Sequence, residues 1–76
     1  MQNVTIYSTP TCHFCHLAKE YFKEHGVAYT EYDVLSDMQK RQEMVQKSGQ
    51  LGVPVILIGE NVIVGFDQER VASLLG

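Results

Sequence analysis

The sequence predicts one α/β domain whose elements follow the order strand, helix, strand, helix, strand, strand, helix. Two observations support this prediction. Stretches with the two-residue period of a strand alternate with stretches of helical period, and later two strand-like stretches follow each other across only two residues. Because strands joined by a helical crossover run parallel and a two-residue turn forces antiparallel pairing, we expect a mixed sheet.

The first strand and the first helix are predicted on either side of Pro10. Residues 4–8, VTIYS, combine β-branched and aromatic side chains, as strands do. Beyond Pro10, apolar residues recur at helical spacing as far as His25, and Gly26 is typical of the position just after a helix. We expect an amphipathic helix whose apolar face includes Phe14, Leu17, Ala18, Tyr21 and Phe22.

A second strand and helix are predicted in the next part of the chain. Residues 28–34, AYTEYDV, alternate in polarity and carry aromatic side chains, so they are expected to form the second strand. Ser36 is followed three residues later by Gln39, which matches a capping box. We therefore expect Ser36 to be the N-cap of a helix that runs to about Lys47 and ends before Gly49.

The last part of the chain predicts a hairpin and a final helix. Residues 53–58, VPVILI, form a strand candidate with proline at its second position, and residues 55–58 suit a central strand buried on both faces. Gly59 and Glu60 offer a tight turn into residues 61–64, and Asp67 can cap the last helix. A four-stranded mixed sheet flanked by three helices in this order is the thioredoxin-like fold, and we expect residues 1–76 to form a single domain of this kind.

Composition excludes several classes of function. Six Lys and Arg stand against nine Asp and Glu, and the charges are scattered, which argues against a nucleic-acid surface. No apolar stretch reaches the roughly 20 residues that span a bilayer, and the first residues do not resemble a signal peptide. We therefore expect a cytoplasmic protein without a membrane segment.

A chain this short leaves little room for an enclosed cofactor, and we expect none to be bound.

Both cysteines lie in the stretch TCHFCH, residues 11–16, which has several chemical interpretations. It matches a redox-active dithiol at the start of a helix, half of a zinc site, or the attachment motif of a c-type haem. Zinc would need further ligands, and no second Cys-x-x-Cys is present. A haem would need wrapping helices that the pattern does not predict. An iron–sulfur cluster shared between two chains stays open as an alternative.

The position of the cysteines favours the redox dithiol. Residues three apart on a helix are neighbours, so Cys12 and Cys15 can form a disulfide with little backbone movement. A purely structural disulfide over so short a loop would contribute only about 2 kcal/mol. The positive end of the helix dipole favours the Cys12 thiolate, so we expect its pKa to lie below the roughly 8.5 of free cysteine. We predict that Cys12 attacks and Cys15 resolves.

Three stretches of the sequence together resemble glutaredoxins: VTIYSTPTCHFCHLAKEYFKEHGV, GVPVILI and VGFD. The resemblance covers residues 4–75 and implies glutathione as a co-substrate. It also implies a cis peptide bond before Pro54 opposite the cysteines, which would leave the Val53 backbone free to pair with a substrate segment. It places Asp67 and the Phe66 backbone at the γ-glutamyl end of glutathione, Gln50 at its glycine carboxylate, and Phe14 where the motif usually has tyrosine.

Two departures from the glutaredoxin pattern leave the electron donor open. Thr9 stands where glutaredoxins commonly have a lysine that would pair with glutathione. Gly65 and Phe66 resemble NrdH-type redoxins, which take electrons from thioredoxin reductase and pass them to ribonucleotide reductase. The expected partners are therefore glutathione or thioredoxin reductase, together with disulfide-bearing proteins such as ribonucleotide reductase, and we expect a monomer. His16 and Lys19 could stabilise the thiolate or simply be solvated.

Overall fold

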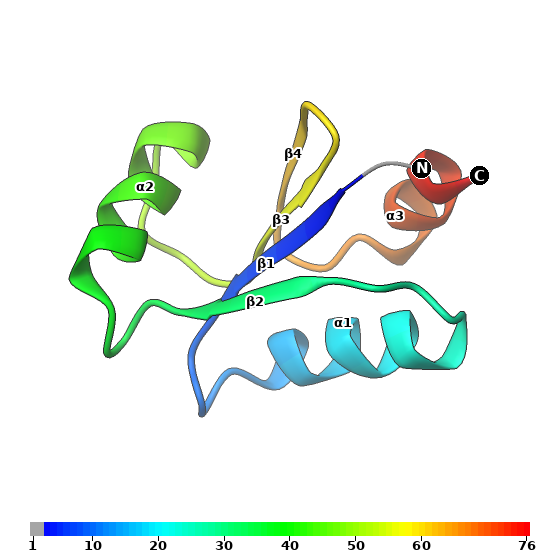
Figure 1. Ribbon diagram of the computed structural model, residues 1–76, viewed down its shortest axis with the longest axis horizontal. Helices are drawn as coiled ribbons and strands as arrows, with labels where there is room; N and C mark the ends of the chain where they lie inside the picture. The colour runs from blue at the N-terminus through cyan, green and yellow to red at the C-terminus, as the bar shows by residue number, and fades with distance from the viewer. Residues whose placement is uncertain (1–2) are drawn as a thin grey trace.

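The computed structural model describes residues 3–76 and contains the expected elements in the expected order (Figure 1). These elements are β1 (Val4–Ser8), α1 (His13–Glu24), β2 (Thr30–Asp33), α2 (Met38–Ser48), β3 (Val55–Ile58), β4 (Asn61–Val64) and α3 (Gln68–Leu75). No helix within residues 3–76 is both long enough and apolar enough to cross a bilayer.

The four strands form one mixed sheet in the order β2-β1-β3-β4. β1 and β2 are parallel, whereas β3 is antiparallel to both β1 and β4. The carboxyl ends of β1 and β2 therefore lie at the same edge of the sheet as the start of β3. We call the segments at this edge, residues 9–12, 34–37 and 49–54, the loop edge. A backbone hydrogen bond of 2.9 Å from Val34 to Ser8 joins two of the strand ends there.

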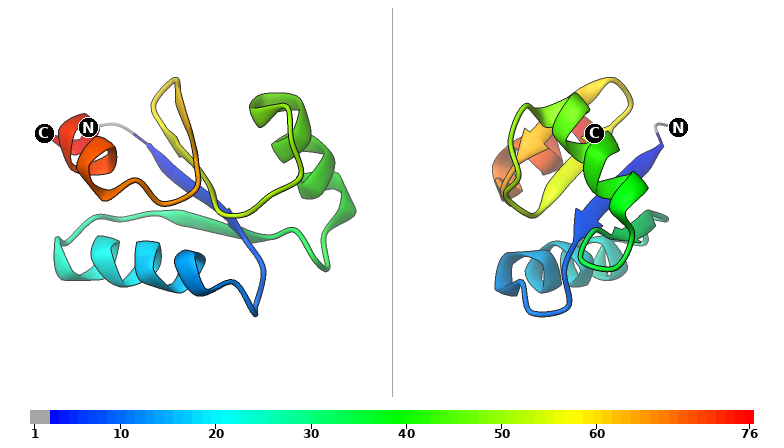
Figure 2. Two further views of the ribbon diagram at one scale, coloured as in Figure 1. Left: turned by 180° about the vertical axis from the view of Figure 1, so that it is seen from behind. Right: turned by 90° about the vertical axis from the view of Figure 1, so that its left-hand side faces the viewer.

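The helices cover both faces of the sheet, as the right-handed crossovers predict. Figure 2 shows α2 standing apart from α1 and α3. On the face of α1 and α3, the core consists of Val4, Ile6, Ala18, Phe22, Ile56, Ile58, Ile63 and Val71. On the face of α2, a smaller core consists of Tyr7, Val34, Met44 and Val55. Since Val55, Ile56 and Ile58 are all buried, β3 is the central strand that the sequence predicts.

The expected apolar face of α1 is partly wrong. Phe14 is 57% exposed and Leu17 is 36% exposed, whereas Cys15, Ala18 and Phe22 are fully buried. These three residues are spaced at i, i+3 and i+7, so the buried stripe is rotated by one residue from the expected one. The rotation places a cysteine against the sheet and leaves an aromatic ring beside it in solvent.

The expected start of α2 is also wrong. The N-cap is Asp37, whose side chain accepts a hydrogen bond of 3.1 Å from the Lys40 backbone. The Ser36 hydroxyl instead donates to the Asp33 carbonyl at 3.5 Å, outside the helix. Aspartate and serine are about equally good N-caps, so the capping-box pattern could not distinguish them. The helix extends to Ser48, and Gly49 ends it in the left-handed conformation with a φ of 74°.

Two strands are shorter than their sequence patterns. β2 consists only of residues 30–33 instead of 28–34, because its register with β1 begins at Thr30. β3 starts at Val55 and not at residue 53, because Pro54 has no N–H to donate to a neighbouring strand. The expected cis peptide bond between Val53 and Pro54 is present.

Candidate active site

The two cysteines form a disulfide bond at the loop edge. Cys12 and Cys15 have a Cα–Cα distance of 5.2 Å, which lies in the ordinary range for disulfides. The two residues differ in exposure: Cys15 is fully buried, whereas Cys12 is partly exposed. Of the two cysteine residues, Cys12 is therefore the one that contacts solvent.

Cys12 is the N-cap of α1, as its place after β1 and a short loop predicts. Its backbone is extended, with φ −82° and ψ 112°, and its sulfur accepts a hydrogen bond of 3.1 Å from the Cys15 backbone N–H. The Cys12 N–H donates to the Thr9 carbonyl at 3.3 Å and so closes the preceding turn. A backbone donor and the positive end of a helix both point at this sulfur, which is the environment that favours a thiolate.

The loop before β3 supplies a free backbone segment at the same edge. Pro54 is buried, and its carbonyl accepts a hydrogen bond of 2.8 Å from the Gly65 N–H. That bond holds the Val53–Pro54 segment beside the turn that leads to Phe66 and Asp67. The Val53 backbone forms no hydrogen bond with any residue of the described range 3–76. It is therefore available to an incoming extended chain.

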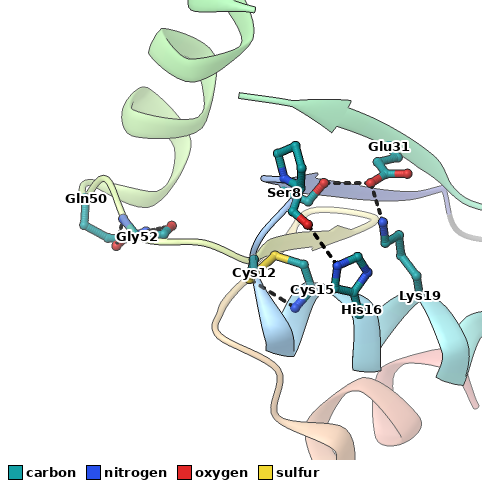
Figure 3. The surroundings of a disulfide bond; sticks show 9 residues. Ser8, Cys12, Cys15, His16, Lys19, Glu31, Gln50 and Gly52 are labelled. Atoms are coloured by element: carbon teal, nitrogen blue, oxygen red, sulfur yellow. Dashed lines mark hydrogen bonds and ion pairs between the residues drawn. A yellow bond between two sulfur atoms is a disulfide. The ribbon is translucent and has the colours of Figure 1, made fainter. Parts of the chain in front are cut away.

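His16 and Lys19 both have partners other than the sulfurs (Figure 3). The His16 ring nitrogen Nε2 lies 3.1 Å from the Pro10 carbonyl oxygen, so it donates a hydrogen bond to the loop that precedes Cys12. Lys19 Nζ lies 2.8 Å from a carboxylate oxygen of Glu31, which also accepts a hydrogen bond of 2.7 Å from the buried Ser8 hydroxyl. The Lys19 hydrogen bond holds the pKa of Glu31 below its usual value.

The residues expected to contact glutathione differ in their exposure and in their present contacts. Phe14 is exposed next to His13, with ring centroids 5.5 Å apart. Asp67 is exposed and caps α3 by accepting a hydrogen bond of 3.2 Å from the Arg70 backbone. Phe66 is partly buried against Tyr21, with ring centroids 5.9 Å apart.

Gln50 is engaged with its own loop. Its Nε2 donates to the Gly52 carbonyl at 3.1 Å, and its Oε1 accepts a hydrogen bond from the Gly52 N–H. Figure 3 shows this turn at the end of α2, away from the disulfide. The side chain would have to leave Gly52 before it could donate to a carboxylate of glutathione.

A partly buried hydrogen bond that the sequence did not predict joins β1 to α2. The Tyr7 hydroxyl donates to Glu43 Oε1 at 2.6 Å, and Glu43 also forms ion pairs with Lys40 at 3.0 Å and Lys47 at 3.6 Å. Burial, followed by the Glu43 hydrogen bond, raises the pKa of Tyr7. The same hydrogen bond, followed by that of Lys40, lowers the pKa of Glu43. The sequence feature that points to this hydrogen bond is the tyrosine within the first strand, because a tyrosine hydroxyl that becomes buried needs a hydrogen-bond partner.

Comparison with known proteins identifies the family. The family model described as glutaredoxin matches residues 4–63. The chain is 44% identical over 72 residues to an uncharacterised glutaredoxin-like 8.6 kDa protein in the rubredoxin operon of Clostridium pasteurianum, covering 95% of this chain and 96% of that protein. It is 40% identical over 67 residues to glutaredoxin 3 of Escherichia coli strain K12, covering 88% and 81%.

Solved structures have the same fold. A crystal structure of a thioredoxin-like protein superposes with a TM-score of 0.91 at 32% identity and covers 99% of this chain and 96% of its own. The NrdH-redoxin of Escherichia coli, described as glutaredoxin-like with a thioredoxin-like activity profile, has a TM-score of 0.83 at 24% identity and covers 95% and 93%. The predicted thioredoxin-like fold is thus confirmed. The chain belongs to the glutaredoxin family and is a thiol-disulfide oxidoreductase with a Cys-x-x-Cys motif.

Proposed function

We propose that Cys12 is the attacking residue and Cys15 the resolving residue in the reduction of protein disulfides and glutathione mixed disulfides. The observation that carries this proposal is the difference in exposure between the two residues: Cys12 is partly exposed and caps α1, whereas Cys15, in the first turn of that helix, is fully buried. An exposed thiolate can attack a substrate, and a buried neighbour one turn away can displace it afterwards.

The proposed reaction has two thiol–disulfide exchanges. The Cys12 thiolate attacks one sulfur of the substrate disulfide, forms a mixed disulfide, and releases the other substrate sulfur as a thiolate that takes up a proton. Cys15 then loses its proton and attacks the Cys12 sulfur. The second substrate thiol leaves, and the Cys12–Cys15 disulfide forms. Two thiols of glutathione return the enzyme to the dithiol state and leave as oxidised glutathione.

The loop edge offers groups that suit the substrate. The free Val53 backbone beside Pro54 can pair with an extended substrate segment. Asp67 uses one carboxylate oxygen as the cap of α3, so its other oxygen can accept a hydrogen bond from the γ-glutamyl amino group. The Phe66 backbone lies at the same place. Exposed Phe14 would flank the sulfur, and Gln50 would contact the glycine carboxylate after release from Gly52.

The roles of the cysteines can be tested by substitution. We expect Cys12→Ser to abolish reduction of both kinds of substrate, because it removes the attacking sulfur. Cys15→Ser should still reduce a glutathione mixed disulfide, because glutathione can replace the resolving thiol, but should lose reduction of insulin disulfides. Both variants are compared with wild type in coupled assays of NADPH consumption. Full activity of the Cys12 variant would contradict the assignment.

Glutathione is the proposed electron donor, and we propose a cytoplasmic monomer. The 40% identity to a glutaredoxin supports this donor. Thr9 and Lys19 favour the alternative, an NrdH-type redoxin reduced by thioredoxin reductase that serves ribonucleotide reductase. Thr9 offers no charge, and the charge of Lys19 is already paired with Glu31, so neither is a free cation for glutathione.

A donor assay distinguishes the two alternatives. NADPH consumption by the disulfide form is followed with glutathione plus glutathione reductase and, in parallel, with thioredoxin reductase alone. We expect faster turnover with glutathione. Thr9→Lys should lower the KM for glutathione by about fivefold through one exposed ion pair, whereas the same change at exposed Thr30 should not. Faster turnover of the wild-type protein with thioredoxin reductase would replace glutathione as the donor.

A further inference from the structure

A groove on the solvent side of α2 has no role in the reaction described above. Its volume is about 370 Å³, near the lower end of the roughly 300–1,000 Å³ of small-ligand pockets. It is lined by Met38, Arg41, Gln42, Val45, Gln46 and Leu51, and we call it the α2 groove. Met38 is 56% exposed and Leu51 is 59% exposed, so apolar side chains face solvent there.

The α2 groove borders the loop edge on two sides. Met38 directly follows segment 34–37, and Leu51 belongs to segment 49–54. Leu35, in the first of these segments, is another exposed apolar residue, at 68%. Leu51 lies only two residues before Val53, whose backbone is free to pair with a substrate. One wall of the groove and the proposed substrate contact at Val53 therefore belong to the same short segment of the chain.

The charge of the α2 groove is positive. Arg41 is the one charged residue among those that line it, and it forms no ion pair with another residue of the described range. The neighbouring cations Lys40 and Lys47 are both paired with Glu43 on another side of the helix. An apolar surface with one uncompensated cation is complementary to an apolar side chain beside a carboxylate.

We propose that the α2 groove binds the segment that flanks the disulfide in a protein substrate, and that it selects segments with an apolar residue next to Asp or Glu. The inference rests on the proposed function, because a substrate strand paired with Val53 is what brings its flanking residues to Leu51. An extended chain advances about 3.3 Å per residue, so residues a few positions from the attacked cysteine reach the groove. Glutathione has no apolar side chain to fill it.

Peptides with a common disulfide test this selection. Each probe has the same intramolecular disulfide and a four-residue arm before or after it: an acidic arm with Leu and Asp, a basic arm with Leu and Lys, an acidic arm with Ser in place of Leu, or no arm. Reduction by the dithiol form of the protein is followed by acid quenching and chromatography. We expect the acidic arm to react about fivefold faster than the basic arm, and the Leu to Ser exchange to cost about fivefold.

Charge reversal provides the matched variants. Arg41→Glu should invert the preference, so that the basic arm reacts faster, while the peptide without an arm reacts at the wild-type rate. Lys23→Glu makes the same charge change at an exposed position in the last turn of α1 and should keep the wild-type preference. Leu51→Asn should remove the advantage of Leu over Ser, with thermal melting as the check that it folds.

The possible results are separable. Equal rates for acidic and basic arms with the wild-type protein would overturn the inference, and so would an Arg41→Glu variant that slows the peptide without an arm as much as the others. Concentration-dependent dimers that Arg41→Glu abolishes would assign the groove to a second copy and also overturn it. If the wild-type protein reduced no peptide at all, the proposed function itself would fail, and this inference would fail with it.

Discussion

At the scale of single residues, Tyr7 shows how one polar group can join a helix to the sheet. Its ring is fully buried in β1, and its hydroxyl donates to Glu43 on α2 at 2.6 Å. Burial and the carboxylate both raise the pKa of Tyr7, so the hydroxyl keeps the proton that it donates. The hydrogen bond spans 36 residues of sequence and ties α2 to the strand that leads to Cys12.

The Tyr7 hydrogen bond should be measurable as stability. We expect Tyr7→Phe to lower the free energy of unfolding by about 1 to 2 kcal/mol, because it removes a hydrogen bond to a charged group and keeps the ring. Tyr29→Phe is the control: its ring also packs on the core, but its hydroxyl has no partner among residues 3–76. Urea unfolding measures both, and equal losses would contradict the role given to the hydroxyl.

At the scale of elements, the start of α2 depends on one carboxylate. Asp37 accepts a hydrogen bond from the Lys40 backbone, whereas Ser36 bonds outside the helix. An unpaired N–H at a helix start costs stability, so the cap determines where α2 begins. Because Met38, the first residue of α2, lines the α2 groove, the cap also helps to place that surface.

Two alanine substitutions separate the true cap from its neighbour. Asp37→Ala should lower the free energy of unfolding by about 1 kcal/mol, because it leaves the N–H of Lys40 unpaired. Ser36→Ala should change it by less than about 0.5 kcal/mol, as expected for an ordinary surface position. Chemical denaturation of both variants gives the comparison. A larger loss for Ser36→Ala would restore Ser36 as the functional cap.

At the scale of the whole molecule, two carboxylates join helices to the sheet from opposite faces. Glu31 on β2 joins Lys19 of α1 to Ser8 of β1, and Glu43 on α2 joins that helix to Tyr7. Hydrogen bonds from Lys19 and from Tyr7, respectively, are the largest causes that lower the pKa of the two carboxyls. Both ion-pair sites are partly exposed, so screening by solvent limits what each contributes.

The direction of these shifts predicts acid sensitivity. A carboxyl whose pKa is lower in the folded than in the unfolded chain stabilises the fold above its unfolded value, here 4.5, and this stabilisation is lost as pH falls through the folded pKa. We expect the free energy of unfolding to decrease as the pH is lowered below 4.5. Glu43→Gln should reduce this loss.

The control is Glu24→Gln, which removes a carboxylate that has no ion pair within residues 3–76. Urea unfolding at pH 7 and pH 3 measures all three proteins. If the free energy of unfolding decreased between pH 7 and pH 3 by the same amount in the wild-type protein and in the Glu43 variant, the prediction would be contradicted.

Much of the fold and part of the site could be predicted from local patterns. The order of elements follows from hydrophobic periodicity and from Gly and Pro positions, and the place of Cys12 at a helix start follows from the strand and loop before it. The cis bond before Pro54 was implied by family resemblance and is present. The rotation of the buried face of α1 and the N-cap of α2 were less predictable, as Phe14, Leu17 and Ser36 show. Neighbouring residues compete for one helix face or for one cap position.

Local patterns along the chain are enough to predict the redox motif, the order of strands and helices, and the residue types at each turn, since each of these depends on neighbours in the sequence. Three features arise only when the chain folds: the burial of Cys15, the ion pair between Lys19 and Glu31, and the hydrogen bond from Tyr7 to Glu43. Folding also brings Leu51 to the side of α2 and so forms the groove. These features join residues from different elements, and their free energy exists only once the sheet and helices have packed together.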